Sequence, residues 1–165
     1  MSESSGLSPQ APTQTRRYHR LDPFLRDLAY VLRNLHHLRR ARIGAAFRER
    51  LMLAVTAINR CRYCAYGHAR LAVRAGVPEE EVQRLLQGYI HDAQPYELPA
   101  LLYASHWAET DAEPDPDAVR LLHINYEPQT RAAIQTTIRT IRLGNLTGNT
   151  WDHFLCRVTR GRLGC

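Results

Sequence analysis

The chain has 165 residues, of which 44% are hydrophobic and 23% charged, and this composition is typical of a globular protein that folds as one domain. No apolar run is long enough for a membrane span and the first residues lack the apolar stretch of a signal peptide, so we expect a cytoplasmic protein without a membrane partner. The net charge of +6 comes entirely from arginine, since the chain has no lysine. This bias favours a compositional origin over phosphate contacts, and we expect no nucleic-acid partner.

Residues 1–20 differ in composition from the rest of the chain. They are rich in Ser, Pro, Gln and Thr and have little to bury, which predicts a disordered or loosely docked N-terminal arm. Residues 21–165 predict a single helical domain. Its first helix is expected to begin at Asp22, followed by Pro23, and a second helix is expected at about 45–59. The stretch "LMLAVTAI" in that second helix is apolar on every side, so we expect protein around it.

The remaining segments also have helical spacing. A helix is expected at about 61–75, closed by Gly76, and another begins at Pro78 with three glutamates near the positive end of its dipole. Three further helices are expected at about 96–109, 116–124 and 128–143. The "GNLTGN" stretch should break or kink the last of these before "TWDHFLCRV". No alternating strand pattern is present, so the expected fold class is all-α.

The segment "RCRYCAYGH" places two thiols and one imidazole on one helix face. At 3.6 residues per turn, Cys61, Cys64 and His68 lie within about 60° around the helix axis. Cys61 is in the first turn, where free N–H groups favour a thiolate, and Arg60 and Arg62 on either side act in the same direction. His68 follows Cys64 by one turn and can transfer a proton to or from it. These features favour thiol redox chemistry.

Two other interpretations of these residues remain open. Cys61, Cys64 and His68 are zinc ligands by type, and His153 or Cys156 can supply a fourth, although a second close-spaced ligand pair is missing. Alternatively, the two cysteines are small core residues and His68 is a core histidine with satisfied hydrogen bonds. The sequence pattern alone does not decide among the three.

The segment "ERLMLAVTAINRCRYCAYGHARLAVRAGVPEEEV", residues 49–82, resembles the carboxymuconolactone decarboxylase/AhpD superfamily. The resemblance is greatest to the AhpD-like alkyl hydroperoxidases. Their signature is a glutamate, eleven residues, C-x-x-C, three residues and a histidine, which Glu49, Cys61, Cys64 and His68 match position for position. One position departs from the best-known hydroperoxidases, which have a second histidine where this chain has Tyr63.

The resemblance implies a thiol-dependent peroxidase or disulfide oxidoreductase. Cys64 would attack a hydroperoxide and become a sulfenic acid, and Cys61 would resolve it as a Cys61–Cys64 disulfide. Glu49 and His68 would form the proton relay. The reaction would need no metal or organic cofactor, and a dithiol or lipoyl-type protein would be the reductant.

The resemblance also implies an AhpD-like bundle of orthogonally packed helices that assembles as a homotrimer or hexamer, with the thiols near a subunit interface. The apolar helix at 51–58 and the segment "YELPALLYASHW" agree with an oligomer, because one small chain would struggle to cover both. Two alternative functions remain: a decarboxylase-type lyase on the same fold, and a non-catalytic helical oligomer that binds zinc or a regulatory partner through Cys61, Cys64 and His68.

The sequence also suggests a role or a position for four residues outside the signature. Tyr63 and His153 are additional candidates for the relay or the pocket, although His153 can reach the site only if the last helix packs on the cysteine helix. Cys156 lies in an apolar helical stretch and is expected in the core, and Cys165 is expected to be loose.

Overall fold

The computed structural model describes residues 15–39, 43–91 and 93–164, and within these ranges every regular element is a helix. The order is α1 (Leu21–Arg39), α2 (Ala45–Asn59), α3 (Arg62–Arg74), α4 (Glu79–Leu86), α5 (Leu98–Glu109), α6 (Pro116–Asn125) and α7 (Pro128–Val158). The all-α prediction is therefore confirmed, with boundaries within two residues of those expected except at the end of the last helix.

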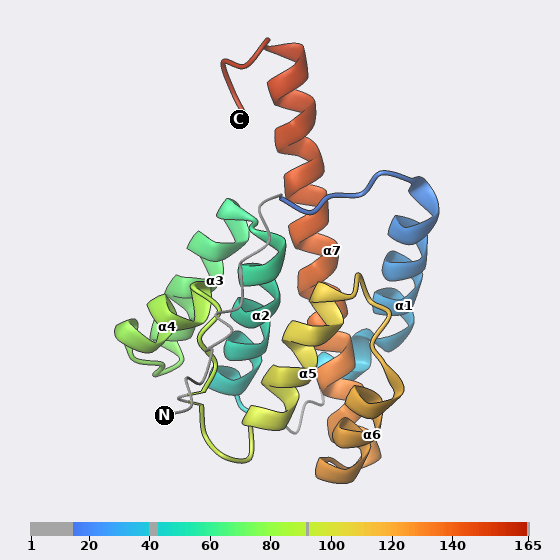
Figure 1. Cartoon of the computed structure of the whole chain (residues 1–165), viewed down its shortest axis with the longest axis vertical. Coiled ribbons are helices and arrows are strands. Elements are labelled where there is room, and N and C mark those ends of the chain that lie inside the picture. The colour runs from blue at the N-terminus through green and yellow to red at the C-terminus, as the bar shows by residue number, and fades with distance from the viewer. Residues whose placement is uncertain (1–14, 40–42, 92, 165) are drawn as a thin grey trace, which may run out of the picture.

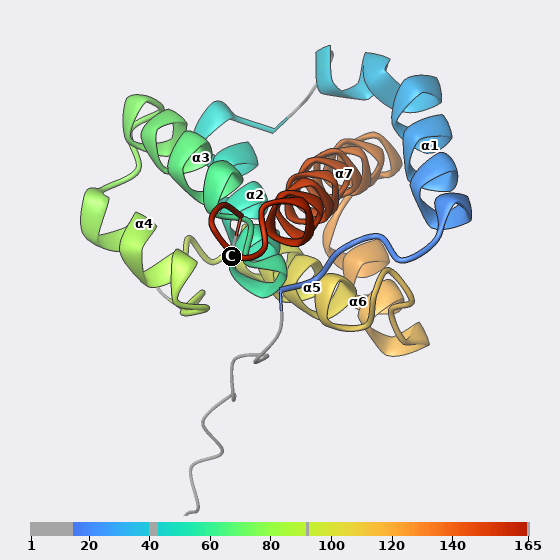
Figure 2. The same ribbon diagram turned by 90° about the horizontal axis from the view of Figure 1, so that it is seen from above.

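Helix α2 lies in the centre of the molecule and contacts α3, α4, α5 and α7 (Figure 1). Its residues Leu51, Leu53 and Val55 are completely buried. Seen along α7, α1 and α4 lie on opposite sides of this centre (Figure 2). The expectation that "LMLAVTAI" is surrounded by protein is confirmed, and a helix that is apolar on every side provides the core against which the cysteine helix packs.

The expected break at "GNLTGN" is wrong, because α7 continues without interruption from Pro128 to Val158. Its C-terminal end projects beyond the other helices (Figure 1). A side-chain Cβ at Gly148 would lie 3.1 Å from the sulfur of Cys61, and one at Gly144 would lie 3.9 Å from the sulfur of Cys64. The two glycines therefore leave space for α3 beside α7, a tertiary requirement that outweighs their low helix propensity.

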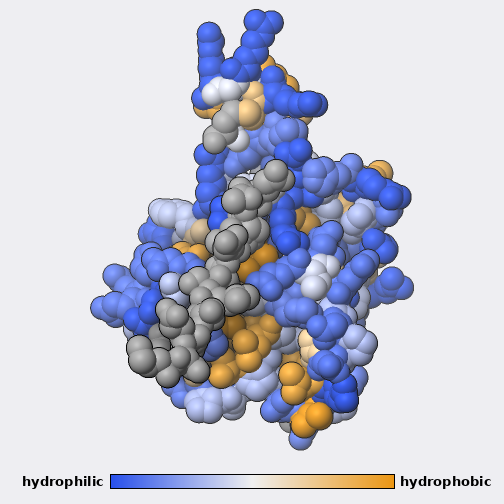
Figure 3. All heavy atoms as spheres, viewed as in Figure 1, coloured by the Kyte–Doolittle hydropathy of each residue, from blue (hydrophilic) through white to orange (hydrophobic). Residues whose placement is uncertain are grey.

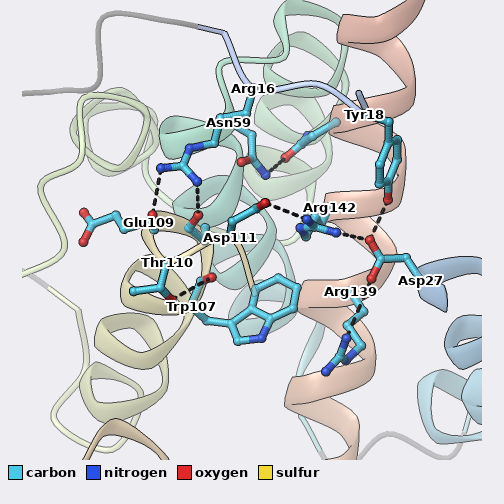
Figure 4. Close-up of polar contacts among 12 residues, drawn as sticks. Arg16, Tyr18, Asp27, Asn59, Trp107, Glu109, Thr110, Asp111, Arg139 and Arg142 are labelled. Carbon is cyan, nitrogen blue, oxygen red and sulfur yellow. Dashed lines mark hydrogen bonds and ion pairs between the residues drawn. The ribbon is translucent and has the colours of Figure 1, made fainter. Parts of the chain in front are cut away.

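The described part of the expected N-terminal arm, residues 15–20, is attached to the helical body. The guanidinium of Arg16 donates to the carbonyl oxygens of Ala108 and Glu109, each at 2.8 Å (Figure 4). The backbone N–H of Tyr18 donates to the hydroxyl of Thr150 on α7 at 3.1 Å. Residues 1–14 of the arm lie outside the described residues.

A buried polar cluster joins α1 to α7. Arg142 on α7 forms an ion pair with Asp27 on α1, and both side chains are almost inaccessible to solvent (Figure 4). The hydroxyl of Tyr18 donates to Asp27 at 2.6 Å, and a second nitrogen of Arg142 lies 2.6 Å from Asp111. Because a buried charge is costly without a partner, this cluster favours one position of α1 on α7.

Much of the apolar surface that motivated the oligomer expectation is buried within one chain, since Leu101, Tyr103 and Trp107 face the core. Other apolar side chains remain exposed on the projecting end of α7, namely Trp151, Phe154 and Val158. Figure 3 shows a largely hydrophilic face with separate hydrophobic patches, one of them at this end. Among the described helices, none is both long and apolar enough to cross a membrane.

Candidate active site

The turn between α2 and α3 positions Cys61. Helix α2 ends at Asn59, and Arg60 adopts a left-handed backbone conformation with φ of 55° while its N–H donates to the carbonyl of Thr56. A side chain in this conformation costs about 1 kcal/mol relative to the right-handed region. Cys61 then becomes the N-cap of α3, and its sulfur accepts a hydrogen bond from the backbone N–H of Cys64 at 3.4 Å.

The two thiols of the C-x-x-C motif are in contact. Both cysteines are free, and their sulfurs lie 2.7 Å apart. The hydrogen bond with Cys64 lowers the pKa of the Cys61 thiol to about 6, with further help from backbone N–H groups, although burial opposes the shift. The same hydrogen bond, together with burial, raises the pKa of Cys64. The reduced pair therefore shares one proton, with the negative charge on Cys61.

Solvent access and negative charge belong to different cysteines of the pair. Cys61 is 0% exposed, whereas Cys64 is only partly buried. A reactant from solvent therefore has access to Cys64, and the stabilised thiolate lies behind it. Because the sulfurs are in contact, a proton can pass from Cys64 to Cys61 without any backbone movement.

A buried amide beside the sulfurs was missed by sequence reasoning. The side chain of Asn145 on α7 hydrogen-bonds both cysteines and lowers the pKa of each. Its amide nitrogen donates to the hydroxyl of Thr56 at 3.1 Å, and its oxygen accepts from Asn59 at 3.2 Å. The local sequence offers one signal, an asparagine between two helix-disfavouring glycines, and this pattern predicts a break or a kink.

The two residues inside the C-x-x-C motif hold α3 against α7. The hydroxyl of Tyr63 donates to Asp152 on α7 at 2.6 Å, and the guanidinium of Arg62 donates to the same oxygen at 2.8 Å. Tyr63 therefore points toward α7 and is half exposed. This contact places α3 over Gly148, the position at which a larger residue would collide with Cys61.

Glu49 and His68 lie together as their signature positions led us to expect. Glu49 on α2 is 4% exposed, and its Oε2 lies 2.7 Å from Nδ1 of His68 on α3. Its other oxygen lies 3.6 Å from Nε of Arg48. The carboxylate fixes the orientation of the imidazole, so Nε2 is the ring nitrogen left for proton transfer.

His153 lies near the cysteine helix, since it lines a cleft together with Arg60 and Arg62. Cys156 is partly exposed, so the expectation that it belongs to the core is wrong. It lies on the projecting part of α7, where few elements cover the helix. Cys165 is outside the described residues. Within those residues, no group of three or more His, Cys, Asp or Glu side chains is arranged to hold a metal ion, so the zinc interpretation has no geometric support there.

Comparison with known proteins places the chain in a family. A model of the carboxymuconolactone decarboxylase family matches residues 23–110, which include the cysteine pair, Glu49 and His68. Neither a curated protein nor a solved structure gives a significant match. The matched segment covers more than half of the 165 residues and runs from α1 to the end of α5. The chain therefore belongs to the carboxymuconolactone decarboxylase family.

Proposed function

We propose that this protein is a thiol-dependent peroxidase or disulfide oxidoreductase that reduces alkyl hydroperoxides through Cys61 and Cys64. The observation that carries the proposal is the contact of two free thiols, 2.7 Å apart, one with its pKa lowered to about 6. The Glu49–His68 pair supplies a proton-transfer group on the same helix as Cys64. Membership of the carboxymuconolactone decarboxylase family is compatible with this chemistry, although the family also includes other activities.

The first step uses the division of labour between the two sulfurs. The proton of Cys64 moves to the buried Cys61 thiolate, and the accessible Cys64 thiolate attacks the terminal oxygen of the hydroperoxide. An S–O bond forms and the O–O bond breaks, which gives a sulfenic acid on Cys64 and an alkoxide. The sulfur is oxidised by two electrons and the peroxide is reduced by two.

Protonation of the alkoxide and closure of the disulfide complete the oxidation. The protonated imidazole of His68, held at Nδ1 by Glu49, gives its Nε2 proton to the alkoxide, which leaves as an alcohol. Cys61 then attacks the sulfenic sulfur, and its proton leaves with the hydroxyl as water. The product is a Cys61–Cys64 disulfide.

A dithiol reductant returns the pair to its starting state. One thiolate of the reductant attacks the disulfide and forms a mixed disulfide, and its second thiol then releases the reduced protein. A small dithiol or a lipoyl-bearing protein provides both thiols in one molecule. The pair itself carries the electrons, so the proposed cycle uses no metal or organic cofactor.

Three measurements on purified protein test this function. We expect two thiols to be lost on addition of one equivalent of cumene hydroperoxide, no stoichiometric zinc, and steady consumption of hydroperoxide when dihydrolipoamide is supplied. One zinc ion bound per wild-type chain, and none bound when Cys61 or Cys64 is replaced by serine, would contradict the redox assignment. Cysteine-independent decarboxylation of a carboxymuconolactone without peroxide consumption would assign the lyase activity instead.

A further inference from the structure

A cleft of about 320 Å³ opens beside the start of α3, between that helix, the second half of α7 and the segment at residues 15–17. The side chains relevant to its chemistry are Arg17, Arg60, Arg62, Asn149, Asp152 and His153. The C-x-x-C assignment does not use this cleft. Its volume is sufficient for a small organic molecule or for the polar end of a larger one.

The cleft has an excess of positive charge. Three arginines line it against one aspartate, and Asp152 is already bound by Arg62. Among the described residues, the guanidinium groups of Arg17 and Arg60 form no ion pair. Burial together with the charges of Arg17 and Arg157 lowers the pKa of His153, as expected in a positive potential. Two cations thus remain available for an anionic ligand.

The cleft and the cysteine pair share a wall. Arg60 and Arg62 are the immediate chain neighbours of Cys61. Asn149 lines the cleft and follows Gly148, the residue that packs on the sulfur of Cys61. A ligand whose charged end lies in the cleft is therefore next to the turn that carries Cys61. Cys61 is buried and Cys64 does not line the cleft, so the uncharged part of the ligand has to extend from the cleft to reach Cys64, the more accessible thiol.

We propose that this cleft binds the anionic group of a small carboxylate- or phosphate-bearing substrate of the Cys61–Cys64 pair. The inference rests on the proposed thiol chemistry, and it assigns that chemistry a class of substrate. Arginine is suited to this task because its planar guanidinium donates two parallel hydrogen bonds to a carboxylate or phosphate. The positive potential also raises the local concentration of anionic reactants and speeds their association.

The test compares the rates at which two disulfide reagents, one anionic and one neutral, react with the reduced protein. Dithiobis(nitrobenzoate) carries two carboxylates and dithiodipyridine is neutral. Each oxidises a dithiol to a disulfide and is itself reduced, the first to two nitrothiobenzoate thiolates and the second to two thiopyridones. The variants are Arg17→Gln, Arg60→Gln and their combination. Arg70→Gln on α3 is the matched control, since it removes an exposed arginine outside the cleft. A Cys61→Ser/Cys64→Ser chain gives the background from the other cysteines.

We expect the double arginine variant to lose roughly three- to ten-fold more of its rate with the anionic reagent than with the neutral one, and this ratio removes any effect of Arg60 on the Cys61 thiolate itself. The control should retain both rates at the same salt concentration. Equal losses in Arg70→Gln and in the cleft variants would overturn the proposal, because they would reflect overall charge alone. Unchanged rates with the anionic reagent would overturn it as well.

A direct binding measurement separates this inference from the proposed function. Inorganic phosphate or citrate bound in the cleft should raise the pKa of His153, followed by the NMR signals of its imidazole in the wild type but not in Arg17→Gln/Arg60→Gln. If hydroperoxide is not consumed but this shift and the reagent preference are present, the anion site stands and the peroxidase assignment falls. If hydroperoxide is consumed and neither effect appears, the anion site is refuted.

Discussion

Cys61 and Cys64 are three residues apart, yet their surroundings divide the properties of a reactive thiol between them. Cys61 has the lowered pKa and complete burial, and Cys64 has the access to solvent. Contact between the sulfurs joins these properties, because the buried thiolate accepts the proton of the accessible thiol. The lowered pKa belongs to the resting pair, and reaction at Cys64 requires the proton to move first.

The shared proton predicts an unusual titration of the reduced protein. One thiolate should be present above a pKa of about 6 and lost as the pH falls through that value, while the second thiol stays protonated to high pH. The thiolate absorbance in the ultraviolet, followed against pH, measures this. The single variant Cys64→Ser, which removes the partner sulfur, should move the midpoint toward the ordinary cysteine range. A wild-type midpoint in that ordinary range would contradict the shared-proton description.

The contact between Glu49 and His68 predicts that removal of the carboxylate slows peroxide turnover. Glu49→Gln keeps the shape of the side chain but removes the carboxylate from Nδ1 of His68, so peroxide turnover should fall roughly one hundred-fold. Arg48→Gln is the control, because it removes only the 3.6 Å contact on the other carboxylate oxygen. Steady-state rates across pH compare the two variants. Equal turnover by Glu49→Gln and wild type would exclude Glu49 from the relay.

The candidate residues were predictable from sequence to different degrees. Glu49 follows only from matching the signature of a known family. Helix spacing alone places Cys61, Cys64 and His68 on one face, but it does not decide among redox, zinc and core roles for them. Asn145 was not predictable, because a buried amide reaches its partners only through packing of α7 on α2 and α3, and its local sequence predicted only a break or a kink. The hydrogen bonds from Arg62 and Tyr63 to Asp152 join residues about 90 positions apart. They also depend on the packing of α3 on α7, so the local sequence did not predict them.

Helix α7 shows how an element can contradict its local sequence. Two glycines in "GNLTGN" predicted a break or a kink, yet each faces a cysteine of the C-x-x-C motif, and their missing side chains permit the approach of α3 to α7. Helix α2 is the opposite case, since its all-apolar pattern correctly predicted a buried position. The local sequence pattern predicted the position of α2, because α2 is buried on every side. It failed for α7, because there a close contact with another segment decides which residue type fits.

The two glycines give a matched pair of substitutions. Alanine favours a helix over glycine by about 1 kcal/mol. Gly144→Ala should realise most of this gain, because its Cβ meets the sulfur of Cys64 at an ordinary 3.9 Å. Gly148→Ala places a Cβ 3.1 Å from the buried Cys61 sulfur, so it should gain less or lose stability and should alter thiol reactivity. Urea unfolding of the reduced proteins measures the difference, and equal stabilisation by both would refute the close approach.

At the scale of the whole molecule, the exposed apolar side chains of the projecting end of α7 have no cover within the described chain. A groove of about 500 Å³ beside them is lined by residues from the segment 18–24 and from α7, and its apolar side chains include Phe24, Trp151 and Phe154. A second copy of the chain could cover such a surface, and the family resemblance supplies the expected trimer or hexamer.

This assembly is testable in dilute solution. Light scattering should give three or six times the chain mass of 18.9 kDa. Trp151→Glu/Phe154→Glu should shift the protein toward the monomer, whereas Leu121→Glu on α6, which also replaces an exposed apolar residue, should not. A wild-type mass near that of one chain would contradict the oligomer.

Single turnover of the reduced protein tests the central claim most directly. One equivalent of cumene hydroperoxide should yield one equivalent of cumyl alcohol and a disulfide that peptide mapping assigns to Cys61 and Cys64. Cys61→Ser should still form one alcohol and then stop at a sulfenic acid on Cys64, and Cys64→Ser should form none. Alcohol production at the wild-type rate by Cys64→Ser, or wild-type oxidation without a Cys61–Cys64 disulfide, would contradict the account.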